Sequence, residues 1–232
     1  MPSPSPRPTF WGTLGPPERA ALRERGRDQS FPSRSVLVHE GDSSDHVMII
    51  MAGWAKVSSA ASDGHDVVLA VRGPGDLVAE SALLSGRRRS ATITALGPVL
   101  ALVLTAERFA AFLERHPAAW QRVSDTFIRR LGDADHRLQA HVSASGGQRL
   151  AALLADLAEL SAYHRPPGPN GAIEIGPPLS QEELGSWTDT SRETVARSLA
   201  VLRRRGLIHT GWRRITVLDV AGLRTYAASD LD

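Results

Sequence analysis

The sequence predicts an α+β protein with an N-terminal β-roll of the jelly-roll type, a long amphipathic helix and a C-terminal domain of short helices closed by a β-hairpin. Three observations predict this order. Short β-branched runs separated by turn residues fill residues 30–104, apolar residues at helical spacing fill residues 117–142, and two helix-start signals follow residue 180. The 232 residues provide enough chain for two compact cores.

The composition is that of an ordinary globular protein, with 42% hydrophobic and 22% charged residues. The absence of cysteine excludes thiol nucleophiles, disulfides, cysteine-ligated zinc and iron–sulfur clusters. No apolar run approaches the roughly 18–20 residues that span a bilayer, and the N-terminus lacks the apolar core of a signal peptide. We therefore expect a soluble, cytoplasmic protein.

The N-terminal domain is predicted to be rich in strands. A Pro/Ser-rich tail over residues 1–9 is expected to be disordered, and a short helical pattern covers residues 10–27. The β-branched runs are residues 35–38, 47–51, 55–57, 67–71, 92–94 and 99–104. Turns that contain Gly, Pro or Asp separate these runs, which is typical of an antiparallel barrel or jelly roll. We assign residues 10–116 to this β-roll.

A long helix is predicted over residues 117–142. Its apolar residues recur at spacings of 3, 4, 4, 3, 4 and 4, close to the a/d pattern of a left-handed coiled coil. We interpret the stripe as a dimer interface formed by Trp120, Val123, Phe127, Leu131, Ala134 and Leu138, with Val142 continuing the pattern. Alternatively, the stripe packs only on its own β-roll, since Gly132 weakens the helix by roughly 1 kcal/mol. The arginines expected on the exposed face are Arg122, Arg129, Arg130 and Arg137.

A hinge of small residues, 143–147, separates this helix from a C-terminal domain over residues 148–232. Within that domain, Ser180-Gln-Glu-Glu183 and Thr190-Ser-Arg-Glu193 both have the form of a capping box. The two helices that they begin are separated by a short turn and followed by a β-hairpin. This is the pattern of a winged helix-turn-helix.

The positive charge of the chain is concentrated in the second of these helices and the hairpin. The whole sequence has 27 basic and 25 acidic residues, yet residues 191–214 hold seven arginines and only one acidic residue, a local balance of +6. Arginine is suited to phosphates and guanine edges, so the cluster indicates a nucleic-acid partner. The alternative is a solvated helix face.

The side chains near the start of the second helix are the ones that meet base edges when such a helix enters a major groove. Arg192, Glu193 and Arg197 avoid the apolar face of the helix, and we interpret them as base readers. Arginine binds guanine O6 and N7 together, whereas glutamate accepts from the cytosine amino group. The predicted phosphate contacts are Ser180, Ser191, Thr194, Arg213 and Arg214. Alternatively, Arg192 and Glu193 only pair with each other on the surface.

These motifs resemble the cyclic-AMP receptor protein / fumarate-nitrate regulator (Crp/Fnr) family. The segment Ser191–Arg197, followed by Leu202–Ile208, is similar to its recognition helix and wing entry, and the resemblance extends back to the turn at residues 40–42. It implies a homodimeric transcription regulator with a cyclic-nucleotide-binding β-roll, a dimerisation helix and a winged helix-turn-helix. Implied partners are double-stranded DNA with an inverted-repeat operator of TGTGA-like half-sites, and RNA polymerase. Asp189 departs from the glycine that is frequent in the turn, although Asp tolerates the left-handed conformation.

The family's phosphate-binding cassette is matched by residues 75–92. By position, Glu80 resembles the acceptor for a ribose hydroxyl, Arg89 the partner of the cyclic phosphate and Ser90 a hydroxyl donor to that phosphate. Ser81 lies in the same cassette and is assigned to the same site. A buried phosphodiester needs a permanent cation and several donors, which this segment provides. Cyclic AMP is the effector that the resemblance implies.

Two departures keep a second interpretation open. Ala79 replaces the usual glycine before the glutamate, and Ala134-Asp135 replaces the hydroxyl pair that often caps the adenine. In the alternative, an Arg89–Glu80 ion pair holds an empty cassette together, and the β-roll is a scaffold or a sensor of another ligand. The adjacent Arg87 and Arg88 also suit a different anion.

An enzyme and a metal site are not expected. The eight histidines are scattered without metal-ligand spacing, so we predict no bound metal and no required cofactor. The sequence also lacks a P-loop and a nucleophile–base–acid set, which argues against catalysis.

Overall fold

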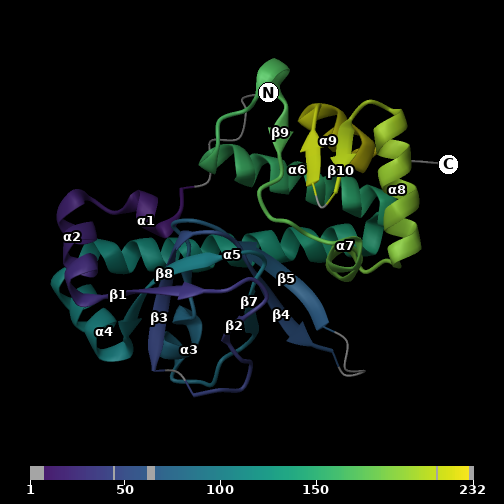
Figure 1. The fold of residues 1–232 in the computed structure, drawn as a ribbon. Coiled ribbons are helices and arrows are strands. Elements are labelled where there is room, and N and C mark those ends of the chain that lie inside the picture. Colours follow the sequence, from purple (N-terminus) through teal and green to yellow (C-terminus); the bar gives the residue numbers. More distant parts are fainter. Residues whose placement is uncertain (1–7, 44, 62–65, 213, 230–232) are drawn as a thin grey trace. The chain divides into compact units, whose positions relative to one another are not determined.

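The computed structural model describes residues 8–43, 45–61, 66–212 and 214–229 (Figure 1). The chain divides into two compact units, one from Pro8 to Asp133 and one that begins at Ala134. The division lies within the long helix α5 (Pro117–Ser143), about ten residues before the predicted hinge. None of the described helices is long and apolar enough to cross a membrane.

The first unit is a β-roll of two four-stranded antiparallel sheets, which confirms the predicted fold class. One sheet has the order β1-β8-β3-β6, with strands Arg27–Phe31, Val99–Thr105, His46–Ala52 and Leu77–Val78. The other has the order β2-β7-β4-β5, with strands Val36–Val38, Thr92–Ala95, Ala55–Ala60 and Asp66–Arg72. Five of the six predicted runs lie wholly in strands, and the run 35–38 does so from Val36. The sequence did not predict β1, because its residues are mostly polar, or β6, because it is two residues long.

The strand β3 is buried on both faces, which explains why its sequence is a continuous apolar run. Val47 and Ile49 point to a core shared with helices, whereas Met48 and Ile50 point to the core between the two sheets. This alternation follows from the two-residue period of a strand. Strand β8 has the same two-sided burial.

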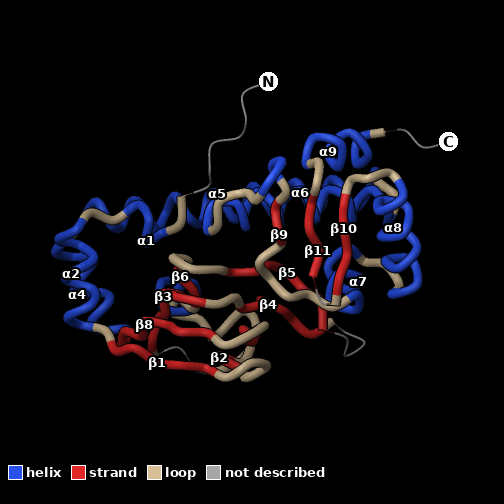
Figure 2. The backbone as a smooth tube through the Cα atoms, turned by 45° about the horizontal axis from the view of Figure 1, so that its top comes forward, coloured by secondary structure: helices blue, strands red, loops and turns tan. Residues whose placement is uncertain are grey.

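The helix-facing core is covered by α1 (Phe10–Thr13), α2 (Pro16–Arg25) and α4 (Ala106–Arg115), together with Ala119 and Val123 of α5. The single helix predicted over residues 10–27 is therefore two helices, broken near Gly15. Thr9 is buried and caps α1 by accepting a hydrogen bond from the Gly12 amide at 3.2 Å. Pro8 and Thr9 thus do not belong to the disordered tail predicted over residues 1–9, of which residues 1–7 lie outside the described residues. Figures 1 and 2 show α2 and α4 side by side.

After the end of α5, the described residues of the second unit form four helices and a three-stranded sheet, whose elements are labelled in Figure 2. The helices are α6 (Gly146–His164), α7 (Gln181–Thr188), α8 (Arg192–Arg204) and α9 (Val220–Ala228), with a 3-10 turn at Pro169–Gly171. The sheet has the order β10-β11-β9, with strands Ile208–Gly211, Arg214–Val217 and Ile173–Glu174. Buried leucines of α6 form the core against α7, α8 and α9. Helix α9 was not predicted from the sequence.

The hinge predicted over residues 143–147 is shorter than expected. Ser143 ends α5, and Gly146 and Gly147 are already part of α6. Ser145 caps α6 in a capping box with Gln148, so only Ala144 and Ser145 lie between the helices. Small residues favour a flexible link, but the cap at Ser145 makes both glycines of this segment helical.

The turn between β3 and β4 depends on Gly53. Its φ of +85° is in the left-handed region, and a Cβ on this residue would lie 2.1 Å from the carbonyl oxygen of Pro98. Gly41 has a φ of +84° but open space around it. A substitution at Gly41 therefore reports the cost of the left-handed conformation alone, whereas one at Gly53 adds the cost of a steric clash.

We expect Gly53→Ala to lower the free energy of unfolding by about 2–4 kcal/mol, because it adds an overpacking clash to the cost of a left-handed alanine. The control Gly41→Ala is expected to lose only about 1–2 kcal/mol. Urea denaturation followed by circular dichroism measures both. Equal losses would contradict the role given to the Pro98 carbonyl.

Candidate functional site

The loop from β6 to β7 contains the residues predicted to bind a ligand. It includes the short helix α3 (Glu80–Ser85) and begins at Ala79, whose φ of 66° is left-handed. An alanine in this conformation is strained by about 1–2 kcal/mol. A glycine would adopt this conformation without strain, so the loop geometry is kept here at a cost.

Arg89 holds this loop in place. Its guanidinium, which is 4% exposed, donates to the carbonyl of Ala79 and, at 2.7 Å, to the carbonyl of His46 on β3. The neighbouring Asp45 lies 2.5 Å from the His46 ring, and this hydrogen bond lowers the pKa of the carboxyl group. Burial lowers the pKa of Arg89, opposed by the charge of Asp45, but a guanidinium remains charged near neutral pH.

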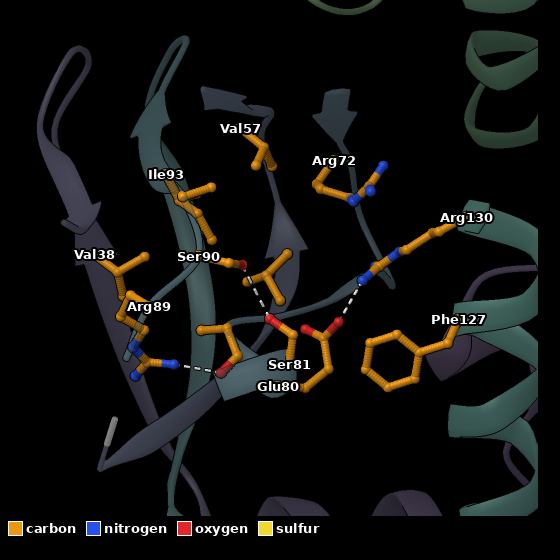
Figure 3. A pocket seen from close by; sticks show the side chains of 13 residues that line it. Val38, Val57, Arg72, Glu80, Ser81, Arg89, Ser90, Ile93, Phe127 and Arg130 are labelled. Carbon is orange, nitrogen blue, oxygen red and sulfur yellow. Dashed lines mark hydrogen bonds and ion pairs between the residues drawn. The ribbon is translucent and has the colours of Figure 1, made fainter. Parts of the chain in front are cut away.

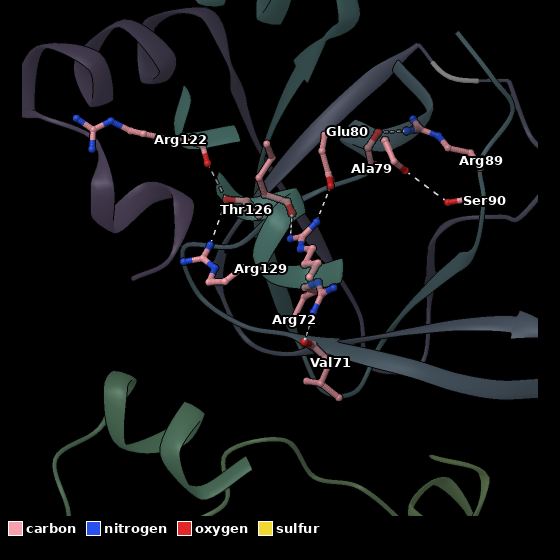
Figure 4. Close-up of polar contacts among 12 residues, drawn as sticks. Val71, Arg72, Ala79, Glu80, Arg89, Ser90, Arg122, Thr126 and Arg129 are labelled. Carbon is pink, nitrogen blue, oxygen red and sulfur yellow. Dashed lines mark hydrogen bonds and ion pairs between the residues drawn. The ribbon is translucent and has the colours of Figure 1, made fainter. Parts of the chain in front are cut away.

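Glu80 is paired with Arg130, not with Arg89. Glu80 is 3% exposed and accepts a hydrogen bond from Arg130 Nη1 at 2.5 Å, and the same guanidinium donates to the carbonyl of Leu77 at 2.6 Å. Figure 3 shows Glu80 and Arg130 in contact, whereas Figure 4 shows Arg89 bonded to Ala79. The Arg89–Glu80 ion pair considered above is therefore wrong. Arg130, expected on the exposed face of α5, instead reaches across to the loop, and the sequence had no signal that connects residues 50 positions apart.

These side chains line a cavity of about 190 Å³ in the β-roll (Figure 3). Its walls combine three arginines, Glu80, the pair Ser81 and Ser90, and an apolar side formed by Phe127 and strand residues. The hydroxyls of Ser81 and Ser90 lie 3.4 Å apart. The lining arginines are Arg72, Arg89 and Arg130. Three cations against one carboxylate make the cavity suited to an anionic ligand with an apolar part.

All four predicted ligand residues, Glu80, Ser81, Arg89 and Ser90, therefore line one cavity. Ala134 and Asp135 are exposed and are not among its lining residues. Arg87 and Arg88 line a separate, more open hollow of about 440 Å³ that shares Ser81, Ser90 and Phe127 with the first. The sequence missed Arg72 and Phe127 as pocket residues.

Helix α5 divides its apolar side chains between the β-roll core and the surface. Val123 is 1% exposed and belongs to the core, so its assignment to a dimer interface is wrong. Phe127 is partly buried against the same core. The predicted stripe combined residues of two neighbouring helix faces. At 100° per residue, Val123 lies about 60° to one side of Trp120, toward the core, and Ile128 lies about 80° to the other side, toward solvent.

The large apolar residues that α5 exposes form a stripe of their own. Its members are Trp120, Ile128, Leu131, Leu138 and Val142, between 49% and 84% exposed. They lie within about 80° of one another around the helix, and Ala134 lies next to them. Ile128 was not predicted. We call these five residues the α5 stripe.

The two helix starts of the helix-turn-helix have the expected kind of caps. Ser180 Oγ accepts from the Glu183 amide at 3.1 Å, and Glu183 Oε2 accepts from the Ser180 amide at 2.8 Å. The second cap differs from the prediction, because Ser191 rather than Thr190 begins the helix and accepts from the Thr194 amide at 3.2 Å. Between the helices, Asp189 ends α7 with a left-handed φ of 48°.

The three predicted base readers lie together on the exposed surface of α8. Arg192, Glu193 and Arg197 are exposed, whereas Val195, Leu199 and Leu202 on the opposite face are buried. Arg197 Nη2 donates to Thr194 Oγ1 at 3.1 Å, which orients its guanidinium. Hydrogen bonds from its own amide and from Ser191 hold the pKa of Glu193 below its usual range, so it is ionised near neutral pH.

The predicted phosphate contacts are in part engaged within the chain. The Ser180 hydroxyl accepts in its cap and has a hydrogen to donate, whereas the hydroxyls of Ser191 and Thr194 lie 3.1 Å apart, so that one of them donates to the other. Arg214 is exposed with its Nε 3.6 Å from Glu174 Oε1. Arg213 lies outside the described residues.

The turn of the helix-turn-helix is fixed by residues that the sequence did not single out. The guanidinium of Arg149 on α6 donates to the carbonyls of Thr188, Asp189 and Ala144 at 2.8, 3.0 and 2.7 Å. His141 Nε2 lies 3.0 Å from Asp189 Oδ2. Two hydrogen bonds from one guanidinium therefore join the start of α6 to the turn that precedes α8, and the third holds Ala144, just before α6.

Gly185 allows α7 to approach that turn. A Cβ on Gly185 would lie 2.7 Å from the carbonyl oxygen of Thr190.

Within the described residues, no group of three or more His, Cys, Asp or Glu side chains is arranged to hold a metal ion.

Comparisons with known proteins find a match for each of the two parts of the chain. Residues 28–116 match the family described as cyclic nucleotide-binding domain, and residues 148–226 match the family described as Crp-like helix-turn-helix domain. The chain is 26% identical over 200 residues to the CRP-like cAMP-activated global transcriptional regulator of Mycobacterium tuberculosis, which covers 86% of this chain and 88% of that protein.

Two proteins of Thermus thermophilus are similar over most of their length. The cyclic AMP receptor protein is 27% identical over 222 residues, covering 95% of this chain and 96% of that protein. The crystal structure of a CRP-family transcriptional regulator has a TM-score of 0.68 and 27% identity, and the match covers 88% of this chain and 98% of that chain.

We expect Arg149→Ala to lower the free energy of unfolding by about 1–3 kcal/mol, because it leaves three carbonyls without their charged donor. The control is Arg165→Ala, just after α6, where an exposed ion pair of 3.7 Å to Glu174 is expected to contribute less than about 1 kcal/mol. Urea denaturation of both variants measures the difference. A loss for Arg149→Ala no larger than that of the control would contradict the role of this side chain.

Proposed function

Because the chain belongs to the Crp/Fnr family of transcription regulators, which are not enzymes, we propose that it binds double-stranded DNA as a homodimer under the control of a cyclic nucleotide. The observation that carries the proposal is the exposed set of Arg192, Glu193 and Arg197 on the capped helix α8. Its side chains are placed to read the edges of G·C base pairs in a major groove.

A homodimer presents two copies of α8 and therefore requires an inverted-repeat operator. Half-sites separated by one helical turn, about 34–36 Å, allow both helices to enter successive major grooves on one face of the duplex. TGTGA-like half-sites suit the three base readers. Ser180, Ser191, Thr194, Arg213 and Arg214 hold the flanking phosphates and fix the register.

The α5 stripe forms the dimer contact. Its five large apolar residues are exposed in the single chain, and a second α5 in a parallel arrangement buries them with a roughly 3.5-residue repeat. Ala134 lies inside this contact because its small side chain allows close approach. Val123 and Phe127 contribute only indirectly, by packing α5 on the β-roll.

Cyclic AMP is the proposed effector of the β-roll cavity. The three arginines provide the charge for a cyclic phosphate, Ser81 and Ser90 provide hydroxyl donors, and Glu80 accepts from the ribose hydroxyl. RNA polymerase is the proposed protein partner at the promoter, and the cytoplasm is the proposed location.

A second candidate is a regulator of the same fold that works without a nucleotide. The observation that favours it is that charged groups of the cavity already have partners within the chain. Glu80 is bound to Arg130, and Arg89 is bound to two backbone carbonyls. In that case the β-roll is a scaffold or senses another anion.

We expect Arg197→Ala to lose most of its preference for an operator of two TGTGA half-sites over a scrambled duplex, by roughly 10- to 100-fold, because one bidentate base contact is removed. Salt-sensitive nonspecific binding should remain. The matched control is Arg204→Ala, on the last turn of the same helix, which should weaken binding to both duplexes equally. Fluorescence anisotropy titrations at several salt concentrations measure this, and unchanged discrimination by the Arg197 variant would contradict the assignment of α8.

Calorimetric titration with cyclic AMP should show saturable heat for the wild-type protein, together with a rise in Tm. Arg89→Ala should abolish both, and Ser90→Ala, whose side chain is exposed and not needed for folding, should weaken binding. The absence of heat and of a thermal shift in the wild-type protein would remove nucleotide control and leave the second candidate.

Leu138→Asp should convert the dimer to a monomer, because it places a charge in the apolar contact of two helices. His136→Asp is the control, since it adds the same charge about 200° around the helix from Leu138. Sedimentation equilibrium distinguishes the two states. A dimer that persists in the Leu138 variant would contradict the proposed use of the α5 stripe.

A further inference from the structure

The hollow lined by Arg87 and Arg88 adjoins the ligand cavity of the β-roll. It has a volume of about 440 Å³ and shares Ser81, Ser90 and Phe127 with the cavity, so the two spaces lie side by side. The contacts proposed above for cyclic AMP use neither of its two arginines. The hollow is therefore available to a further part of a ligand.

The hollow provides cations and hydroxyl donors without a carboxylate in its walls. Both arginines are exposed, and the hydroxyl residues that line the hollow are Ser81, Ser85 and Ser90. Within the described part of the chain, none of the lining residues is acidic. On the neighbouring loop, the Glu40 carboxylate is directed to β4, where it accepts from Ser59 Oγ at 3.0 Å. Two permanent positive charges beside three hydroxyls suit a phosphate group.

The two arginines of the hollow differ in how they are held. Arg88 Nη1 donates to the Gly41 carbonyl at 2.8 Å. The same loop is paired with the backbone of Arg89, whose carbonyl accepts from the Gly41 amide and whose amide donates to the Asp42 carbonyl, both at 2.9 Å. The side chain of Arg87 has no hydrogen-bond or ion-pair partner among the described residues. Arg88 is thus fixed in the wall, while all the donors of Arg87 are available to a ligand.

Two neighbouring sites for an anion exceed what a cyclic mononucleotide needs. Cyclic AMP has a single phosphodiester with one negative charge, and Arg89 and Ser90 are sufficient to hold it. Between the two sites lies Phe127, which lines both spaces, and Figure 3 shows its ring next to Glu80. An aromatic ring in this position suits the sugar or base that connects two phosphates.

We propose that the ligand of the β-roll is a nucleotide with two phosphate groups, one in the cavity and the other in the hollow against Arg87 and Arg88. The inference rests on the proposed function, because it requires the cavity to bind a nucleotide phosphate. Cyclic AMP then fills the cavity and leaves the hollow empty. Two sources share this chemistry: a mononucleotide phosphorylated at two positions, and two nucleosides joined by two phosphodiesters.

The test is titration calorimetry on the full-length protein with ligands in matched pairs. Adenosine 3′,5′-bisphosphate is compared with AMP, and cyclic di-AMP with cyclic AMP, so that each pair differs by the second phosphate. Each titration is repeated with cyclic AMP present at saturation. The variants are Arg87→Ala and, as matched control, Arg27→Ala, an exposed arginine on β1 that does not line the hollow. Thermal melting checks that both variants fold.

The wild-type protein and the Arg27 variant should bind one of the two-phosphate ligands roughly tenfold more tightly than its one-phosphate match. The pair that shows the gain distinguishes the two sources. Arg87→Ala should lose the gain while its affinity for cyclic AMP stays that of the wild type. Saturating cyclic AMP should suppress the binding, and added salt should reduce the gain, because the arginine is exposed.

Two results would overturn the inference while leaving the proposed function intact: cyclic AMP binds as tightly as both two-phosphate ligands, or the Arg87 variant keeps the full gain. A two-phosphate ligand that binds equally well in the presence of cyclic AMP would also overturn it, since the phosphates would then be held elsewhere, as by the arginines of α8. If the wild-type protein binds no nucleotide at all, nucleotide control itself fails, and this inference fails with it.

Discussion

The buried guanidinium of Arg89 is the contact on which the ligand cavity depends. It joins the carbonyl of Ala79, in the strained loop after β6, to the carbonyl of His46 on β3. A left-handed alanine costs about as much as a charged hydrogen bond contributes, so this arginine and the loop conformation belong together. The same side chain supplies a permanent positive charge at the cavity wall. Arg89 therefore both holds the loop in its conformation and provides a positive charge for an anion. An anion that enters the cavity would find this side chain already in position.

Helix α5 connects that cavity with the exposed stripe. On one side it sends Arg130 to Glu80 and packs Val123 into the β-roll core, and on another it exposes the α5 stripe. A ligand that competes with Arg130 for Glu80 acts on a side chain of this helix. A ligand shifts the equilibrium between two conformations only if it binds one of them more tightly than the other, and the Glu80–Arg130 contact is one that a ligand could favour or break. The helix thus gives a physical basis for coupling between the cavity and the proposed dimer contact.

The helix-turn-helix is held both by contacts between neighbouring residues and by contacts between residues far apart in the sequence. The caps at Ser180 and Ser191 begin its two helices, and Gly185 allows the turn to lie close to α7. Arg149 then binds the turn from α6, and Arg203 binds the hairpin from α8. The exposed arginines of α8 are therefore carried by a frame whose backbone is fixed before any DNA is present, and such preorganisation lowers the cost of binding.

Features that depend on residues close together in the sequence could be predicted from it. The strand runs, the cap at Ser180, the exposed face of α8 and the grouping of the cassette residues were all predictable, because period, capping and turn chemistry act over a few residues. Only the tertiary structure decided which side chains meet across the fold. Glu80 binds Arg130 rather than Arg89, Val123 faces the core while Ile128 faces outward, and Arg149 reaches the turn 40 residues away. Such pairings depend on how sheets and helices pack, and a local pattern does not contain that information.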